Sequence, residues 1–268
     1  MATKKAATAK KARAKSQPAK TTVTTVKAVE VTKSSATRST GDRRTILAAA
    51  LIGEFIGTFM LVAAFLVSGG EYLYVGLTLV GLILTVGTLS GAYLNPLLTV
   101  GGWVTRKLSH LRAVGYLVAQ LLGAAAAFAA LTAFVSAGAS AAGSSSFTQA
   151  PELFHFNPLT DKNQWYIFGA ELVASSVLAF AFAGALIEKT DRVAKALTVG
   201  LTLLGASMVA GLAAKSLAAS VAINPAIALA AKGVDFSAFT WGAVVVYIAA
   251  PLIGGIIGFA LRDFVETK

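Results

Sequence analysis

Residues 90–99 read SGAYLNPLLT, and residues 220–229 read SVAINPAIAL. Each stretch places an Asn-Pro pair at the start of a short apolar segment. Asn is a favoured N-cap residue, because its side chain accepts hydrogen bonds from the free N–H groups of the first helical turn. Pro suits the first helical position, where its missing N–H costs nothing. The pattern therefore predicts two helices that begin at these pairs, over residues 95–108 and 224–232.

The rest of the chain predicts an all-α membrane protein. It is 56% hydrophobic and 13% charged, with a mean hydropathy of +0.73, whereas a soluble domain carries about 25% charged residues. Six apolar runs reach or approach the about 17–25 residues that span a bilayer. They do not alternate as the strands of a membrane barrel do. The six expected transmembrane helices are residues 46–68, 72–89, 113–135, 165–187, 196–214 and 239–261.

An internal repeat orders these helices. GEFIGTFMLVAAF, from residue 53, is similar to AELVASSVLAFAF, from residue 170. Each half then reads as a helix with a Glu, a second helix, an Asn-Pro segment and a third helix. Because three spanning helices are an odd number, the second half enters from the opposite side, which gives a 3+3 inverted repeat over about 45–136 and 164–262. The Asn-Pro segments are too short to span, so we expect re-entrant half-helices that meet at mid-membrane.

The two repeated acids, Glu54 and Glu171, are the only ones deep within the spanning runs. A central carboxylate costs about 2.5–3.5 kcal/mol on translocon scales. We expect each to act as a structural brace that accepts hydrogen bonds from backbone N–H groups leading into a half-helix. The alternative is a role in proton relay or ion coupling.

The charge of the chain lies mainly in its first 44 residues, which hold 12 of the 23 Lys and Arg and two of the 12 acids. This low-complexity segment predicts a disordered basic tail. Its charge could attract anionic lipid headgroups or nucleic acid. With the tail in the cytoplasm, 20 of the 23 cations lie on the cytoplasmic side, as the positive-inside rule favours. The sequence thus predicts a multi-pass protein of the cell membrane with both termini cytoplasmic, including a short C-terminus at 263–268.

Enzyme chemistry finds little support in the sequence. The chain has no cysteine, which excludes cysteine-based catalysis and metal binding. Its two histidines, His110 and His155, fall in expected connections, and no cluster of His, Ser or Asp lies in the membrane runs. We therefore expect no catalytic residue, no metal and no cofactor.

Taken together, the two Asn-Pro motifs, the SGA before the first, the paired Glu residues and the inverted repeat resemble the major intrinsic protein family of aquaporins and glycerol facilitators. The resemblance covers about residues 46–262. It implies a homotetramer with one pore per subunit, which passes water or a small uncharged solute. It also implies that two Asn side chains donate to permeant oxygens while opposed half-helix dipoles interrupt proton hopping. The implied pore motifs are Asn95, Pro96 and Leu97, and Asn224, Pro225 and Ala226.

The departures from the family pattern concern selectivity. Leu97 stands where the family usually has Ala, Tyr93 where it has His, and Ile227 where it has the Arg of the narrowest constriction. Counting from Asn224 places further filter positions near Leu212 and Val221. The second-helix position lies somewhere between Val75 and Val80. The predicted outer constriction is thus apolar and lacks its cationic guard, which favours neutral solutes with apolar surface or a gate that closes by dewetting.

Three functions follow from the sequence. The first is a passive channel for water or glycerol-like solutes. The second is a secondary transporter on broken helices, for which Glu54 and Glu171 are the only candidate coupling groups. The third is a non-conducting membrane scaffold with a basic tail.

Overall fold

The computed structural model describes residues 40–142, 152–187 and 191–266, and within these ranges every regular element is a helix. Six helical stretches of this part are long and apolar enough to cross a membrane. The predicted all-α fold with six membrane-length helices is therefore confirmed. The long helices are α1 (Thr40–Val67), α2 (Tyr72–Ser90), α4 (His110–Ala142), α5 (Gln164–Ile187) and α6 (Arg192–Lys215). The sixth stretch joins α8 (Trp241–Val244), a π-helical turn η1 (Val245–Ala249) and α9 (Ala250–Glu266), and the short helices are α3 (Pro96–Val104) and α7 (Pro225–Ala230).

Several helices are longer than their apolar runs. Helix α1 begins at Thr40, so residues 40–44 are helical rather than part of the predicted tail. Arg43 and Arg44 belong to a residue type with high helix propensity, so the helix continues past the apolar run. His110 is the first residue of α4 rather than a loop residue, and its Nδ1 accepts a hydrogen bond of 2.6 Å from the indole N–H of Trp103. The predictions for residues 1–39 and 267–268 lie outside the described residues.

The π-helical turn η1 has a local cause in Pro251. Proline lacks an N–H and its ring crowds the carbonyl one turn earlier, so a regular α-helix cannot continue through it. Here the chain widens instead, and the N–H of Ala250 donates to the carbonyl of Val245, five residues back. The wide turn lets one helix cross the whole fold despite the proline.

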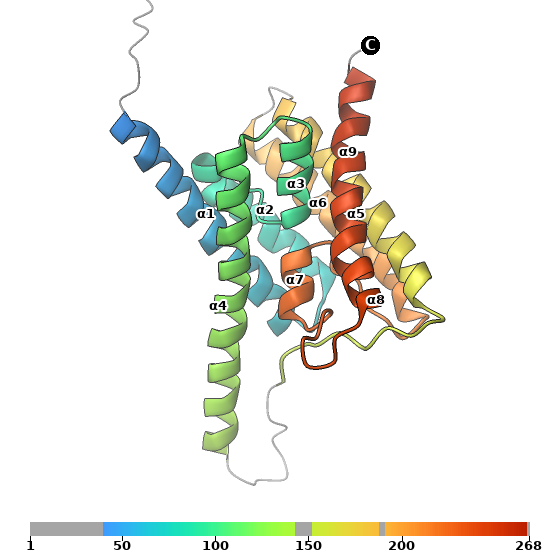
Figure 1. Cartoon of the computed structure of the whole chain (residues 1–268). Coiled ribbons are helices and arrows are strands. Elements are labelled where there is room, and N and C mark those ends of the chain that lie inside the picture. The colour runs from blue at the N-terminus through green and yellow to red at the C-terminus, as the bar shows by residue number, and fades with distance from the viewer. Residues whose placement is uncertain (1–39, 143–151, 188–190, 267–268) are drawn as a thin grey trace, which may run out of the picture. The chain divides into compact units, whose positions relative to one another are not determined.

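The helix pairs repeat in the two halves. Helix α1 packs on α2 and α4 as α5 packs on α6 and α9, and α2 and α6 pair across the two halves. Figure 1 shows the half-helices α3 and α7 stacked end to end between the long helices. Glycines allow these close approaches: a Cβ at Gly123 of α4 would lie 2.5 Å from the carbonyl oxygen of Phe55, and one at Gly258 of α9 would collide with that of Ser176.

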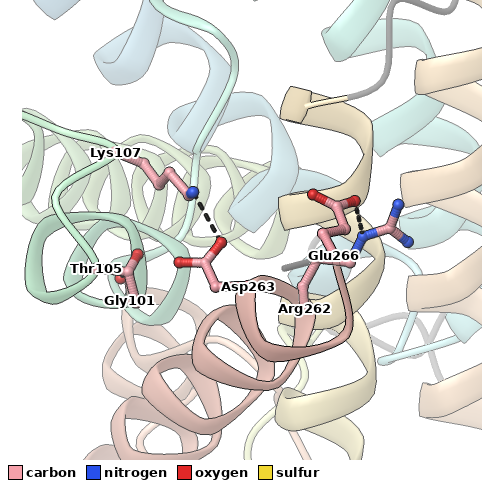
Figure 2. A network of polar contacts seen from close by, with 6 residues as sticks. All are labelled: Gly101, Thr105, Lys107, Arg262, Asp263 and Glu266. Carbon is pink, nitrogen blue, oxygen red and sulfur yellow. Dashed lines mark hydrogen bonds and ion pairs between the residues drawn. The ribbon is translucent and has the colours of Figure 1, made fainter. Parts of the chain in front are cut away.

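Charged side chains join the elements at the end of the fold where α9 finishes. Figure 2 shows Lys107, just after α3, reaching Asp263 of α9, with 2.7 Å between Nζ and the carboxylate. Arg262, the residue before Asp263, pairs with Glu266 in the next turn of α9. The guanidinium of Arg262 also lies over the ring of Phe180, 5.4 Å from its centre. The first half-helix is thus fixed to the last long helix at this end, which we call the terminal side; α1 begins on this side too (Figure 1).

Candidate functional site

The two Asn-Pro motifs meet tip to tip. Asn95 and Asn224 are the N-caps of α3 and α7, and their side-chain oxygens accept hydrogen bonds of 3.0 Å from the N–H groups of Leu97 and Ala226. Pro96 and Pro225 are the first residues of the two helices.

Each Asn also reaches across to the other motif. The Nδ2 of Asn95 donates to the carbonyl of Ile223 at 2.8 Å, and the Nδ2 of Asn224 donates to the carbonyl of Leu94 at 3.2 Å. These carbonyls belong to the residues just before the opposite Asn. The two side chains are 4% and 1% exposed, so the pair lies deep inside the fold.

The two buried acids bind the non-helical segments that lead into α3 and α7. Glu54 accepts hydrogen bonds from the N–H groups of Tyr93 and Leu94 at 3.0 and 2.7 Å. Glu171 accepts them from the N–H groups of Ala222 and Ile223 at 2.6 and 2.9 Å. Both carboxylates are fully buried, and they supply partners that backbone N–H groups outside a helix would otherwise lack.

A strained turn follows in each approach. Leu94 and Ile223 both have a φ of +50°, in the left-handed region that costs a non-glycine residue of order 1–3 kcal/mol. Each is held there by its N–H bond to a buried carboxylate and by its carbonyl bond from the opposite Asn. The turn aims the following Asn at the centre.

Three supporting residues were not predicted from the sequence. The hydroxyls of Tyr116 and Tyr247 donate to the carbonyls of Ser90 and Ser220, one in each half, at 2.7 and 3.2 Å. Gln120 donates to Glu54 at 2.7 Å and to the hydroxyl of Thr99 in α3 at 2.9 Å. Gln120 could have been noticed, because it is the one amide side chain in the apolar run 113–135.

A cavity of about 560 Å³ opens on the side away from the terminal side, and we call it the far-side cavity. The α1–α2 connection, the start of α2, the end of α6 and residues 218–220 form its walls. Tyr72, the first residue of α2, reaches across to Gly211 of α6, where any Cβ would collide with the phenol. Tyr72 and Gly211 are therefore wall residues that the sequence analysis missed.

The predicted filter residues separate in the structure. Leu212 lies at this cavity but is 75% exposed, so the neighbouring Gly211 and not Leu212 faces Tyr72. A shift of one residue turns a helical side chain by about 100°, which explains the difference. Val80 packs against Gly200 where α2 crosses α6. Val75, Val221 and Ile227 are all buried, as is Leu97 behind the first motif.

A second cavity, of about 290 Å³, lies on the terminal side, and we call it the terminal-side cavity. The last turn of α2, the last turn of α5 and the first turn of α6 form its walls. The two cavities thus lie at opposite ends of the α2–α6 pair. In the described residues no group of three or more His, Cys, Asp or Glu could hold a metal ion.

Residues 45–261 match the sequence model of the major intrinsic protein family. The chain belongs to this family. It is 30% identical to glycerol uptake facilitator protein-like 6 of Lactiplantibacillus plantarum over 77% of this chain and 93% of the relative. It is 28% identical to aquaporin Z of Photorhabdus laumondii over 79% of this chain and 93% of the relative.

The fold also has a solved counterpart. The aquaglyceroporin of Plasmodium falciparum superposes with a TM-score of 0.57 at 21% identity, over 82% of this chain and 96% of that one. Members of the major intrinsic protein family are passive channels and not enzymes. This multi-pass membrane protein is accordingly a channel for water or small solutes.

Proposed function

We propose that this major intrinsic protein passes glycerol-like polyols and other small uncharged solutes along a path between its two cavities, with the crossed Asn pair at mid-membrane. The crossed pair carries the proposal. An amide has two N–H donors, and each Asn uses one on the opposite motif, so a second remains to offer a permeant oxygen. The opposed starts of α3 and α7 bring two positive dipole ends to the same point, which disfavours cations.

The two other candidate functions have weaker support. A coupled transporter would need a carboxylate free to exchange protons or ions. Both oxygens of Glu54 and both of Glu171 accept hydrogen bonds from backbone N–H groups, which favours the brace role. A scaffold without conduction would not need two half-helices whose polar tips meet in the interior.

The assembly and orientation belong to the same proposal. The family resemblance favours a homotetramer, and an apolar groove along α5 and α6 presents Val173 and Val209 as 63% and 75% exposed. Such a surface suits either a neighbouring subunit or lipid, so sizing in detergent by light scattering gives the number of chains.

We propose the terminal side as the cytoplasmic side of the cell membrane, and the part of the predicted 1–44 tail that precedes α1 as a basic segment that contacts anionic lipid.

Proteoliposomes test the function. Shrinkage in an impermeant sugar, which reports water, and re-swelling after a gradient of glycerol or urea, which reports solute entry, should be faster than in protein-free vesicles, with no effect of an imposed proton gradient. Asn95→Ala should abolish most of the solute flux per folded protein. Asn163→Ala is the matched control, because the buried Asn163 amide also donates to a carbonyl, that of Leu217, but lies just before α5 and outside the two Asn-Pro motifs. Flux that follows the proton gradient would favour the transporter, and no flux the scaffold.

Selectivity can be tested at Ile227, which directly follows the second motif and is 1% exposed. Its side chain offers no donor, whereas an arginine offers five in a rigid fork. Ile227→Arg should lower glycerol flux more than water flux in stopped-flow measurements. Ile227→Leu is the size-matched control, for which we expect an unchanged ratio. If the Arg variant assembles and its glycerol-to-water ratio is unchanged or higher, Ile227 does not line the constriction.

A further inference from the structure

The terminal-side cavity narrows to an aromatic floor. Phe182 of α5 lines the cavity but is only 3% exposed, so little more than its edge faces the space. The ring of Tyr93 lies edge-on against it, with 4.9 Å between the ring centres. Tyr93 is two residues before Asn95 and is 4% exposed. The Tyr93 ring therefore connects Phe182, which lines the cavity, to the first Asn-Pro motif.

The two rings are held firmly in place. Tyr93 packs on Tyr116 of α4, with 5.7 Å between ring centres, and Phe182 packs on Phe259 of α9 at 6.1 Å. Gly102 of α3 closes a further side, since a Cβ there would lie 3.0 Å from the Tyr93 ring. Rings packed on several sides cannot swing aside without displacing a helix. The pair thus forms a fixed constriction and not a loose flap.

The wall above this floor is positively charged. Arg192 and Lys195, both in the first turn of α6, line the cavity. Within the described part of the chain no carboxylate lines it, and nearby Asp191 uses its side chain on the N–H groups of Val193 and Ala194. The far-side cavity differs, because Glu71 and Lys215 there are of opposite sign. The excess positive charge along the described path lies at the terminal side.

We propose that the terminal-side cavity is a second selection site of the channel, at which the Tyr93–Phe182 pair limits solute size and Arg192 and Lys195 repel cations. The inference rests on the proposed function, because it assumes that solutes cross between the two cavities. It assigns cation exclusion to the terminal-side cavity, because the uncharged side chain of Ile227 cannot repel cations. It also predicts that the size limit depends on the terminal-side rings.

The size limit is tested with Phe182→Ala in proteoliposomes, using glycerol and the bulkier four-carbon polyol erythritol. The variant should raise erythritol permeability about tenfold, equivalent to about 1.4 kcal/mol of barrier, with a smaller change for glycerol. Phe180→Ala is the matched control, since Phe180 lies on the same helix but stacks on Arg262 outside the cavity.

The charge is tested with the double variant Arg192→Gln and Lys195→Gln, by the rate of K⁺ leak from the same vesicles. The K⁺ leak should rise several-fold, by a larger factor than any change in glycerol flux, and added salt should reduce the difference by screening. Lys232→Gln is the control, because Lys232 is exposed and follows α7 on the far side.

The outcomes separate this inference from the proposed function. If the unchanged protein conducts glycerol and the cavity variants match their controls in erythritol flux and K⁺ leak, the second selection site is refuted and the channel proposal stands. A second outcome is that the unchanged protein conducts no solute, whereas Phe182→Ala conducts. In that case the rings close the path, and only the claim that the unchanged channel is open is refuted. If no variant conducts, both are refuted. Variants are compared only where sizing in detergent gives the same peak, tetrameric or monomeric, as the unchanged protein.

Discussion

At the scale of single residues, the two buried carboxylates replace hydrogen-bond partners that the backbone loses where it leaves a helix. An unsatisfied buried donor costs about 1–3 kcal/mol, and each Glu serves two of them. Glu54 has additional support from Gln120. The corresponding place in the second half, one turn after Tyr247, is Pro251. Glu171 therefore depends on its backbone donors more than Glu54 does.

We expect Glu54→Leu and Glu171→Leu to destabilise the folded protein by a few kcal/mol, because two buried N–H groups in each lose their acceptor. Thermal unfolding in detergent measures the loss. Glu54→Gln and Glu171→Gln retain one acceptor oxygen and should fold with an intermediate loss of stability. Normal stability and flux in the Leu variants would show that the carboxylates are not braces.

The wall of the far-side cavity gives a second prediction at this scale. A Cβ at Gly211 would collide with the Tyr72 phenol, whereas a Cβ at Gly205 of the same helix would meet nothing within 4 Å. Gly211→Ala should therefore cost about 1–3 kcal/mol through overpacking. Gly205→Ala should gain up to about 1 kcal/mol from helix propensity. Equal melting temperatures for the two variants would contradict the Tyr72–Gly211 contact.

The sequence was enough to predict the two Asn-Pro motifs, but not all residues in the wall of the far-side cavity. Asn95 and Asn224 could be named because capping chemistry is local and leaves a local signature. Tyr72 and Gly211 could not, because which side of α6 faces α2 depends on helix rotation, which counting back from Asn224 does not fix. Leu212 was selected in this way, and it is 75% exposed.

At the scale of elements, apolar length predicted the six long helices, and the Asn-Pro pairs predicted the two short ones. The ends were less predictable: α1 starts at Thr40 and α4 starts at His110, outside the apolar runs. Hydropathy marks where a helix enters a bilayer and not where its hydrogen bonding ends. The π-helical turn before Pro251 also needs the structure, since proline alone permits a kink or a break.

The contact between α3 and α9 gives a prediction about elements. A Cβ at Gly255 would collide with the carbonyl oxygen of Leu97, while one at Gly81 of α2 would meet nothing within 4 Å. Gly255→Ala should push the first half-helix away from α9 and lower both thermal stability and glycerol flux. Gly81→Ala is the control and should change neither. Unchanged flux with Gly255→Ala would mean that the position of α3 does not govern the path.

At the scale of the whole molecule, positive charge gathers at the start of the chain. The sequence predicts a basic tail over residues 1–44, and we propose that the part of this tail before α1 contacts lipid and does not act on the pore. In nanodiscs of neutral lipid, deleting residues 1–38 should reduce the capture of anionic vesicles at low salt, because the attraction is electrostatic. Glycerol flux in liposomes should stay the same. Capture that survives the deletion would exclude lipid contact through this segment, and a lower flux would assign it a role in conduction.

The crossed Asn bonds also constrain how the molecule is made. They join residues 128 and 130 positions apart in the chain, so the centre cannot close until the ribosome has delivered both repeats. Contacts between such distant residues form late and slowly. Neither half alone offers its Asn the carbonyl that the other half supplies, and an early half-protein would keep a buried amide unpaired. We therefore expect residues 40–142 and 152–266 to remain protease-sensitive when expressed singly and to become resistant only when they are synthesised together in one membrane.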